Sequence, residues 1–378
     1  MNRCDYLFAG TGLAALLTAS ALADAQKLTG KKVVFIEAES HKGNDRTWCF
    51  WDAQPTFPEL IVKKWDFAQV NDAASHRRFS MAPLHYFLMR SGSFYETLRQ
   101  KLTAVPGVQF ITAHIQAVND TGTEVEVQTS DGLWVANKVF SSLYTPPEPI
   151  AQKRFPLIHQ HFVGWFIETD EAAFDPNTVG FMDFSVPQQG NTRFMYVLPF
   201  SEKKALVEYT LFSCELLPKA AYETAIKDYL KQKGIDKYRI EETEQGNIPM
   251  TCYPFHQRNT DNLIYIGTAG GWTKASTGFT FKNSVRKAQD LAHDWTEQGP
   301  KHRKPKWSRF VFYDRLLLEV LAHENHRGAD LFTSLFIKGN PNLVFRFLDE
   351  ETTLLEEIQL ILRCPKMPFL RALGRVLF

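Results

Sequence analysis

The sequence predicts an α/β protein in which a nucleotide-binding core encloses an inserted mixed β-sheet, followed by a helical tail. A strand, a glycine turn, a helix and a second strand open the chain, and a second glycine-rich segment at 267–278 again lies between a strand and a helix. Between these units, residues 161–212 are rich in strand patterns. We assign the first domain to 1–52, 85–150 and 253–300, the second to 53–84 and 151–252, and a helical region to 301–378.

The size and composition of the chain indicate a folded protein without a preference for nucleic acid. Its 378 residues can bury a large core, since only 22% of them are charged and 30 are Phe. The 43 basic and 42 acidic residues give a net charge of +1, so we expect no basic field that would attract nucleic acid. The five cysteines lack metal-ligand spacing, which indicates free thiols in a reducing compartment and no metal site.

The first unit carries a dinucleotide-binding fingerprint. Gly10 permits a tight turn after the strand, and Gly12 lets the backbone approach a pyrophosphate. The first helical residues, Leu13 and Ala14, then present free N–H groups to the phosphates. Glu37 ends the next strand, where a carboxylate accepts hydrogen bonds from ribose hydroxyls. This order of elements indicates a Rossmann-type fold more strongly than a glycine turn alone does.

The second glycine-rich segment favours FAD over NAD as the dinucleotide. Gly267, Gly270, Gly271 and Gly278 lie between a buried strand and a helix. Their backbone can approach a ribityl chain and an isoalloxazine ring, and the following helix can present N–H groups to an anionic ring edge. An ordinary strand-to-helix turn is the alternative interpretation. Together the two motifs predict a Rossmann-type FAD-binding fold.

The segments between these motifs follow strand and helix patterns in turn. Residues 93–103 are expected to form a helix, and 107–143 a small meander of strands. The proline-rich segment 146–149 is typical of a crossover linker. Residues 222–234 have amphipathic helical spacing, and the chain beyond 300 is mostly helical and apolar.

A single acid, Glu208, interrupts the apolar hairpin RFMYVLPFSEKKALVEYTLF at 193–212. With a two-residue turn at 202–203, Glu208 is expected to lie opposite Val197. The same face would carry Met195, Leu206, Thr210 and Phe212. Because burial disfavours a charged carboxylate, we expect this side chain to have a raised pKa and to stay protonated. An ion pair with Arg193 at the far end of the hairpin is the alternative.

Several segments, in this order, resemble the FAD-dependent lycopene cyclase family. They are GTGLAALLTA with FIEAE, DRTWCFW, HFVGWFIET, GFMDF, the hairpin above, EQGNIPM and GTAGGWTKASTGFTFKNS. The segment VFRFLDEETTLLEEIQLILRCPKMPF also resembles the C-terminal part of the family, so the resemblance covers nearly the whole chain. It implies a fold related to that of the flavin-dependent aromatic hydroxylases.

The resemblance implies conversion of the linear ψ-end groups of lycopene into β-ionone rings, with no net redox change. It implies FAD that is active in its reduced form, with NAD(P)H as the reductant. It points to Glu208 as the essential acid of the hairpin motif, and we take Asp183 of GFMDF as a second catalytic candidate. We add Trp48, Thr277 and Arg46, which stands where relatives can have His, to the cofactor-binding residues.

Two positions depart from related flavoproteins. Ala15 replaces the third glycine of the fingerprint, which the motif tolerates. Thr268 follows Gly267 where many relatives carry Asp, so an acidic contact to the ribityl chain is missing. This absence argues against a generic hydroxylase more than against a cyclase. A flavin-dependent hydroxylase or isoprenoid reductase, and a carotenoid-binding protein, remain the alternative functions.

The expected substrate, lycopene or a related linear carotenoid, dissolves in bilayers. We therefore expect a cytoplasmic protein that binds peripherally to the inner face of the membrane, with other carotenoid-pathway enzymes as candidate partners. The tail 365–378 combines apolar and basic residues at helical spacing, and the basic run 301–307 would attract anionic lipid. The tail residues are Lys366, Phe369, Leu370, Arg371, Leu373, Arg375 and Phe378. Packing of this tail on the core is the alternative.

Overall fold

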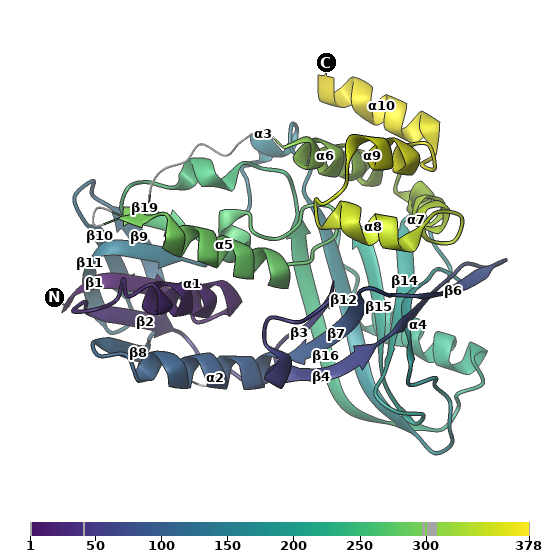
Figure 1. The fold of residues 1–378 in the computed structure, drawn as a ribbon, viewed down its shortest axis with the longest axis horizontal. Coiled ribbons are helices and arrows are strands. Elements are labelled where there is room, and N and C mark those ends of the chain that lie inside the picture. Colours follow the sequence, from purple (N-terminus) through teal and green to yellow (C-terminus); the bar gives the residue numbers. More distant parts are fainter. Residues whose placement is uncertain (1, 41, 297–298, 301–307, 378) are drawn as a thin grey trace.

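The structure, a computed structural model, describes residues 2–40, 42–296, 299–300 and 308–377. Two seven-stranded sheets dominate it, and helices near the C-terminus pack over the second sheet (Figure 1). The expected α/β class, with a Rossmann-type core, an inserted mixed sheet and a helical C-terminal region, is confirmed. Within the described residues, no helix is both long and apolar enough to cross a bilayer.

The first sheet is a parallel sheet with an antiparallel extension. Its strands run in the order β8-β2-β1-β11-β10-β9, and β17 pairs with β11. The bounds are β1 (Asn2–Ala9), β2 (Val33–Glu37), β8 (Val108–Thr112), β9 (Ile115–Asp120), β10 (Val125–Thr129), β11 (Gly132–Ser141) and β17 (Leu263–Tyr265). The meander expected at 107–143 comprises β9, β10 and β11, but β8 pairs in parallel with β2 instead. A helix precedes β8 and returns the chain in the parallel direction.

β2 is apolar on both of its faces because a core that contains Val34 and Ile36 covers one face of the sheet and helices cover the other. They are α1 (Leu13–Asp24), α2 (Ser91–Thr103) and α5 (Phe281–His293). Their apolar side chains form one core with Phe8 and Phe35 of the sheet. The helix expected at 93–103 is thus present and begins two residues earlier.

The second sheet has the strand order β16-β12-β15-β14-β13-β5-β6. The bounds are β5 (Phe67–Asn71), β6 (His76–Ser80), β12 (Ile158–Thr169), β13 (Thr178–Asp183), β14 (Thr192–Pro199), β15 (Lys204–Ser213) and β16 (Tyr238–Met250). Val207 and Leu211 point to α4 (Lys219–Gln232), whereas Leu206 and Phe212 point to the core shared with the C-terminal helices. Both faces are therefore buried.

The register of the β14–β15 hairpin differs by one residue from the expected register. Glu208 lies opposite Tyr196, not Val197, because the chain turns through 201–203 and the Phe200 N–H donates to the Lys204 carbonyl at 2.8 Å. A shift of one residue exchanges the two faces of a strand. The face of Glu208 therefore carries Phe194, Tyr196 and Leu198 together with Leu206, Thr210 and Phe212, and Met195 lies on the other face.

A third sheet contains β3 (Thr47–Asp52), β7 (His85–Arg90) and β4 (Ile61–Trp65). β4 belongs to a segment that we assigned to the second domain, yet it pairs with β7 of the first. The division into domains stays a prediction. Short elements complete the description: α3 (Pro149–Gln152), β18 (Trp295–Thr296), β19 (Gly299–Pro300), η1 (Pro58–Leu60), η2 (Phe255–Arg258), η3 (Gly267–Gly270) and η4 (Asn325–Arg327).

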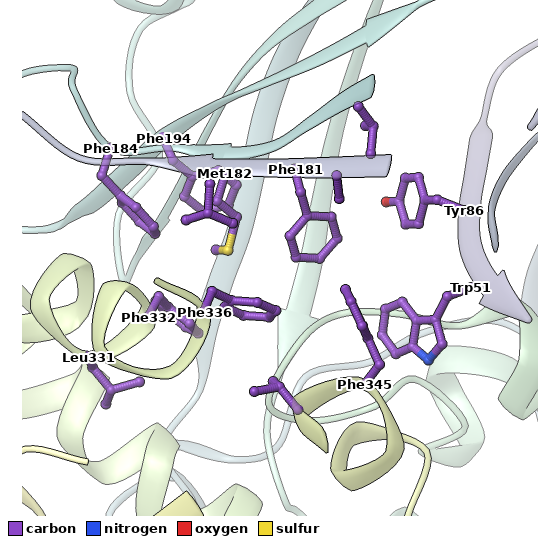
Figure 2. Close-up of a cluster of buried hydrophobic side chains, with 14 of the residues drawn as sticks. Trp51, Tyr86, Phe181, Met182, Phe184, Phe194, Leu331, Phe332, Phe336 and Phe345 are labelled. Atoms are coloured by element: carbon purple, nitrogen blue, oxygen red, sulfur yellow. The ribbon is translucent and has the colours of Figure 1, made fainter. Parts of the chain in front are cut away.

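The C-terminal helices are part of the core. They are α6 (Arg309–His323), α7 (Gly328–Phe336), α8 (Pro341–Leu348), α9 (Leu354–Ile361) and α10 (Lys366–Leu377). Phe345 of α8 lies 4.9 Å from Trp51, 5.5 Å from Phe181 and 5.7 Å from Phe336, measured between ring centroids (Figure 2). This one side chain thus joins β3, β13 and α7.

Replacing Phe345→Ala should lower the free energy of unfolding by about 3–5 kcal/mol, because a fully buried ring leaves a cavity. Urea denaturation followed by circular dichroism measures this change. Leu355→Ala, at a side chain that is 75% exposed, should change the same quantity by no more than about 0.5 kcal/mol. Equal losses in the two variants would contradict the central position of Phe345.

Candidate active site

Two buried carboxyl groups, those of Glu208 and Glu244, meet above a glycine of the second sheet. β12 lies between β15 and β16, and Gly164 pairs with Glu208 on one side and with Glu244 on the other. A Cβ placed at Gly164 would lie 3.4 Å from the Glu208 Cβ and 3.2 Å from the Glu244 Cγ. Because Gly164 has no side chain, the two acids converge on one face, where they are only 8% and 9% exposed.

Hydroxyl groups orient both carboxyl groups. Thr210 Oγ1 donates to Glu208 Oε1 at 2.5 Å, and Thr47 Oγ1 donates to Glu244 Oε2 at 2.6 Å. The two carboxyl groups also lie close enough for each to shift the pKa of the other. A hydrogen bond between them requires a proton on one partner, since two carboxylates have only acceptors.

Burial and like charge favour a proton on this pair. Burial raises the pKa of Glu208 to about 8, and the neighbouring Glu244 charge contributes to the rise. Burial also raises the pKa of Glu244, while the Thr47 hydroxyl and the Arg90 charge act in the opposite direction. The two groups titrate together. Near neutral pH Glu208 is therefore protonated, while the Thr47 hydroxyl and Arg90 favour the charged form of Glu244.

An ion pair between Glu208 and Arg193, the alternative considered above, is wrong. Arg193 lies on the opposite face of the hairpin. Its guanidinium donates to Asn191 Oδ1 and to Gln189 Oε1, each at 2.7 Å, and to the Tyr209 hydroxyl at 3.3 Å.

Asp183, the second catalytic candidate, lies on that same opposite face and is not among the residues that line the cavity described next. Its oxygens accept hydrogen bonds from the Ser185 N–H at 3.0 Å, Asn71 Nδ2 at 3.0 Å, the Tyr229 hydroxyl at 2.9 Å and Lys233 Nζ at 3.1 Å. Burial opposes its ionisation, but these donors lower its pKa. The structure does not bring Asp183 together with Glu208.

One cavity of about 410 Å³ connects the carboxyl pair with the glycine motifs. Tyr86, Tyr196, Leu198 and Leu206 line it near the pair. The expected cofactor residues that also line it are Gly12, Leu13, Ala14, Arg46, Trp48, Gly267, Thr277 and Gly278. The two halves of the predicted site thus face one space.

The N-terminus of α1 offers unused N–H groups to this cavity. Gly12 is the N-cap residue, no side chain caps the first turn, and a Cβ at Gly12 would meet no atom within 4 Å. Gly10 has a φ of +102°, and a Cβ there would collide with Ser142 Oγ. Open space in front of uncapped N–H groups is what an anionic pyrophosphate requires.

Glu37 ends β2 as expected, and its carboxylate is held in the ionised form. One oxygen accepts from the Thr11 N–H at 2.9 Å and pairs with Lys42 Nζ at 2.5 Å, and the other accepts from the Ala38 N–H at 3.0 Å. Burial opposes ionisation, but Lys42 and Thr11 lower the pKa of this group. An ionised carboxylate is the acceptor that ribose hydroxyls need.

The glycines of the second motif have two roles. Gly267 and Gly278, with φ of +61° and +73°, line the cavity. Gly270 and Gly271 do not line it. Gly270 packs against the Tyr265 carbonyl and Gly271 has a φ of +71°, so both shape the turn itself.

Arg46 and Trp48 flank Thr47 at the start of β3. The Trp48 ring packs 5.1 Å from Phe94 and 6.0 Å from Phe281 between centroids, while Arg46 Nη1 donates to the Asp45 carbonyl at 2.6 Å. Trp48 therefore belongs to the core of the first domain and to the cavity wall at once.

Sequence reasoning missed Glu244, Gly164 and the two threonines. Glu244 follows Glu241 and Glu242, and such an acidic run is typical of a solvated edge strand. The available signal was Gly164, since a glycine inside an apolar strand marks a close approach of other groups. Its pairing with two acids depends on strand order, which the residue pattern alone does not contain.

The comparison of sequences finds one matching family and several similar proteins. A family model described as "Lycopene cyclase protein" matches residues 5–374. A lycopene beta-cyclase from Pantoea ananas is 25% identical to this chain, over 99% of this chain and 98% of that protein. A lycopene beta-cyclase from Paracoccus sp. is 26% identical, over 76% of this chain and 73% of that protein.

Solved flavoproteins share the fold. The p-nitrophenol 4-monooxygenase PnpA from Pseudomonas putida has a TM-score of 0.59 at 14% identity, over 100% of this chain and 99% of that chain. A variant of the halogenase PltM in complex with FAD has a TM-score of 0.60 at 12% identity, over 92% and 82% of the two chains. The expected likeness to flavin-dependent hydroxylases is therefore confirmed for the fold, and the match over residues 5–374 shows that this chain belongs to the lycopene cyclase family.

Proposed function

We propose that this chain is a flavin-dependent lycopene β-cyclase, which closes the linear ψ-end groups of lycopene into β-ionone rings by acid–base catalysis. The observation that carries the proposal is the buried pair of Glu208 and Glu244 at the wall of the cavity. An alkene is protonated only by a strong acid or by a neutral acid held against it without water. The protonated Glu208 carboxyl group meets that requirement at neutral pH.

The walls around the pair suit a hydrocarbon. Lycopene offers no heteroatom, so its binding depends on apolar contact and shape. Aromatic rings and aliphatic side chains line the cavity near Glu208, and Tyr196 lies directly opposite it in the hairpin. The π face of such a ring also attracts a cation. The same wall therefore suits both the substrate and the carbocation that protonation creates.

The residues at the other end of the cavity fit FAD. The uncapped N-terminus of α1 with Gly12 would hold the pyrophosphate, Glu37 the ribose, and Gly267 and Gly278 would allow the ring system to approach the backbone. Reduced FAD, maintained by NAD(P)H, would supply negative charge that stabilises the carbocation electrostatically. The role of the protein itself is to enclose Glu208 and the substrate end group in one space without bulk water.

Gly12→Val should fold but lose most of its bound flavin, because the added side chain occupies the space in front of the α1 N–H groups. Flavin absorbance after gel filtration measures the loss, and circular dichroism verifies the fold. Gly374→Val, at a position on α10 that also has open space, serves as the matched control and should retain flavin. Full flavin content in the Gly12 variant would contradict the assignment of the pyrophosphate site.

Glu208→Gln should lower turnover by roughly 10²–10⁴-fold while flavin stays bound, because the amide keeps the shape of the side chain but has no acidic proton. Expression in a lycopene-accumulating host with pigment analysis, followed by assays with purified protein, measures this. Glu202→Gln, in the exposed hairpin turn, is the control. Wild-type turnover in the Glu208 variant would rule out Glu208 as the proton donor.

The same assay separates the alternative functions. A flavin-dependent hydroxylase or isoprenoid reductase would consume NAD(P)H in proportion to product, whereas a cyclase needs reductant only to keep FAD reduced. A carotenoid-binding protein would take up pigment without forming a product. Either result in the wild-type protein would replace the cyclase proposal.

We also propose peripheral binding to a membrane through α9 and α10. Their exposed apolar side chains are Leu354, Leu355, Ile358, Ile361, Leu362, Met367, Leu370 and Leu377. Arg363, between the two helices, and Lys366, at the start of α10, are exposed and suit an anionic lipid surface. The basic run 301–307 and Phe378 lie outside the described residues.

The tail differs in detail from the sequence expectation. Arg371 and Arg375 form ion pairs with Glu324, and Arg375 also with Glu319, so their charges face α6 rather than solvent alone. Phe369 packs against the core. The helix thus packs on the core with one face and leaves a second apolar face exposed.

The triple variant Leu355→Glu, Leu362→Glu, Leu370→Glu should reduce the fraction that floats with phosphatidylglycerol-containing vesicles by at least about tenfold, because each lost leucine contact removes about 1.5–3 kcal/mol. The matched control carries Glu at the exposed positions Val62, Leu216 and Ile240. Equal flotation of the two triple variants would reject α9 and α10 as the binding surface.

A further inference from the structure

We propose that Glu244 is the base of the cyclisation: it removes the proton that the ring-closed cation loses and returns it to Glu208 through a hydrogen bond between the two carboxyl groups. This inference rests on the cyclase function proposed above. It assigns a second catalytic residue and makes the acid self-restoring, so that no outside proton is needed between turnovers.

The cavity offers Glu244 as the carboxyl group nearest to the acid. Both side chains line the cavity and converge above Gly164. A third carboxyl group, that of Asp45, also lines the cavity, but it accepts a hydrogen bond from Ser91 Oγ at 3.0 Å at the start of α2. Ser91 begins α2, which shares the core of the first sheet with α1. Position therefore favours Glu244 as the partner of Glu208.

The chemistry requires an acid and a base close together. Protonation of the terminal double bond places a cation on the carbon that carries the two methyl groups. The inner double bond then attacks this carbon, which closes the ring and moves the cation to the methyl-bearing ring carbon. Loss of a proton from the adjacent ring carbon that bears the polyene chain forms the β-ring double bond. One proton enters and one leaves, and no electrons are exchanged with the flavin.

The protonated carbon and the deprotonated carbon are both bonded to the carbon that carries the two methyl groups. They are therefore close neighbours on one ring. Two carboxyl groups in mutual contact match this separation, whereas a base elsewhere in the cavity would require the cation to turn before it lost its proton.

The charge of the pair drives the return of the proton. Before the reaction the pair carries one proton, and after Glu208 donates, two carboxylates face each other and repel. The substrate cation beside them relieves this repulsion until Glu244 accepts the second proton. Thr47 and Arg90 stabilise the charged form of Glu244, while burial favours the neutral form of Glu208, so the proton moves back to Glu208.

The position of the base also selects the ring type. The ring-closed cation has hydrogens on three neighbouring carbons: the chain-bearing ring carbon, a ring methylene and a methyl group. Their loss gives the β-ring, the ε-ring and an exocyclic double bond, respectively. The chain-bearing carbon and the ring methylene both lie two bonds from the carbon that was protonated, so the side on which a fixed base stands chooses between them. Glu244 is thus expected to determine the β product.

The pair titrates in an environment that several elements provide. The ionisable groups that face it from neighbouring strands are Cys49 of β3, Tyr86 and Arg90 of β7, Tyr196 of β14 and Glu242 of β16. Burial raises the pKa of Cys49, Tyr86 and Tyr196, so these groups stay neutral around neutral pH. Arg90 pairs with Glu242, which limits the net charge that the pair experiences.

The test compares Glu244→Gln, Glu244→Asp and the control Glu241→Gln, an exposed acid on the same strand. Turnover, its pH profile and the ratio of ring types are measured with purified, reduced holoenzyme and lycopene. We expect Glu244→Gln to lower turnover by roughly 10²–10⁴-fold and to give ε-ring or exocyclic products beside the β-ring. Glu244→Asp should recover part of the rate, and the control should match the wild type.

The pH profile of turnover adds a measurement that would stay unchanged if Glu244 had only a structural role. Wild-type turnover should fall as the pH rises through about 8, where Glu208 loses its proton. Without the Glu244 charge the pKa of Glu208 falls, so in Glu244→Gln this limb should shift to lower pH. Infrared titration of the protonated carboxyl band in the wild type and in the Gln variant measures the same shift of the Glu208 pKa independently of activity.

Two results would overturn the inference. The first is a wild-type turnover rate in Glu244→Gln. The second is a reduced rate in that variant with no change in the pH at which turnover falls and no change in the ratio of ring types. If the Gln variant does not fold, Glu244→Asp decides through its product ratio, which should shift because the base is one methylene shorter. A wild-type enzyme that forms no cyclic product would instead overturn the proposed function, which keeps the two failures distinct.

Discussion

The site depends on one constraint, which is that two carboxyl groups must share the space above Gly164. A side chain at this position would come within 3.4 Å of both acids and separate them. The charge of an isolated buried carboxylate is costly, and a pair that shares one proton buries one charge instead of two. The constraint also fixes the strand register, because a slip of β15 or β16 by one residue would move one of the two acids to the face that packs against α4. Cores on both faces of the second sheet oppose such a slip.

The same cavity requires the C-terminal helices to hold its cofactor side in place. Lys274, in the second glycine-rich segment, is buried and pairs with Asp314 of α6 and with Glu350, each at 2.9 Å. Asp349 accepts from Lys282 of α5 and from Trp51 Nε1, each at 2.8 Å. Because buried ion pairs add little net stability, we attribute to these contacts the positioning of the glycine-rich loop. The helical region thus completes the site, although it supplies none of the carboxyl groups.

The sequence was sufficient for the fold class and for the local geometry of the first glycine turn, because both depend on local patterns. Gly12 and Glu37 occupy their expected places, since a strand, a turn and a helix in series fix their positions within a few residues. The hairpin register was wrong because a turn of one more residue leaves the same apolar alternation in the sequence. Glu244 could not be found, because its pairing with Glu208 crosses a third strand that is distant in the chain.

Glu208 and Asp183 show why burial alone does not raise the pKa of a carboxyl group. Both carboxyl groups are buried in the same sheet, yet the pKa of Glu208 is raised and that of Asp183 is lowered. Asp183 receives four hydrogen bonds, one of them from the Lys233 ammonium group, and these donors stabilise its charge more than burial opposes it. Glu208 has one hydroxyl donor, and its other neighbour is a second acid. The number and sign of the partners therefore decide which carboxyl group is held ionised beside α4 and which one stays protonated.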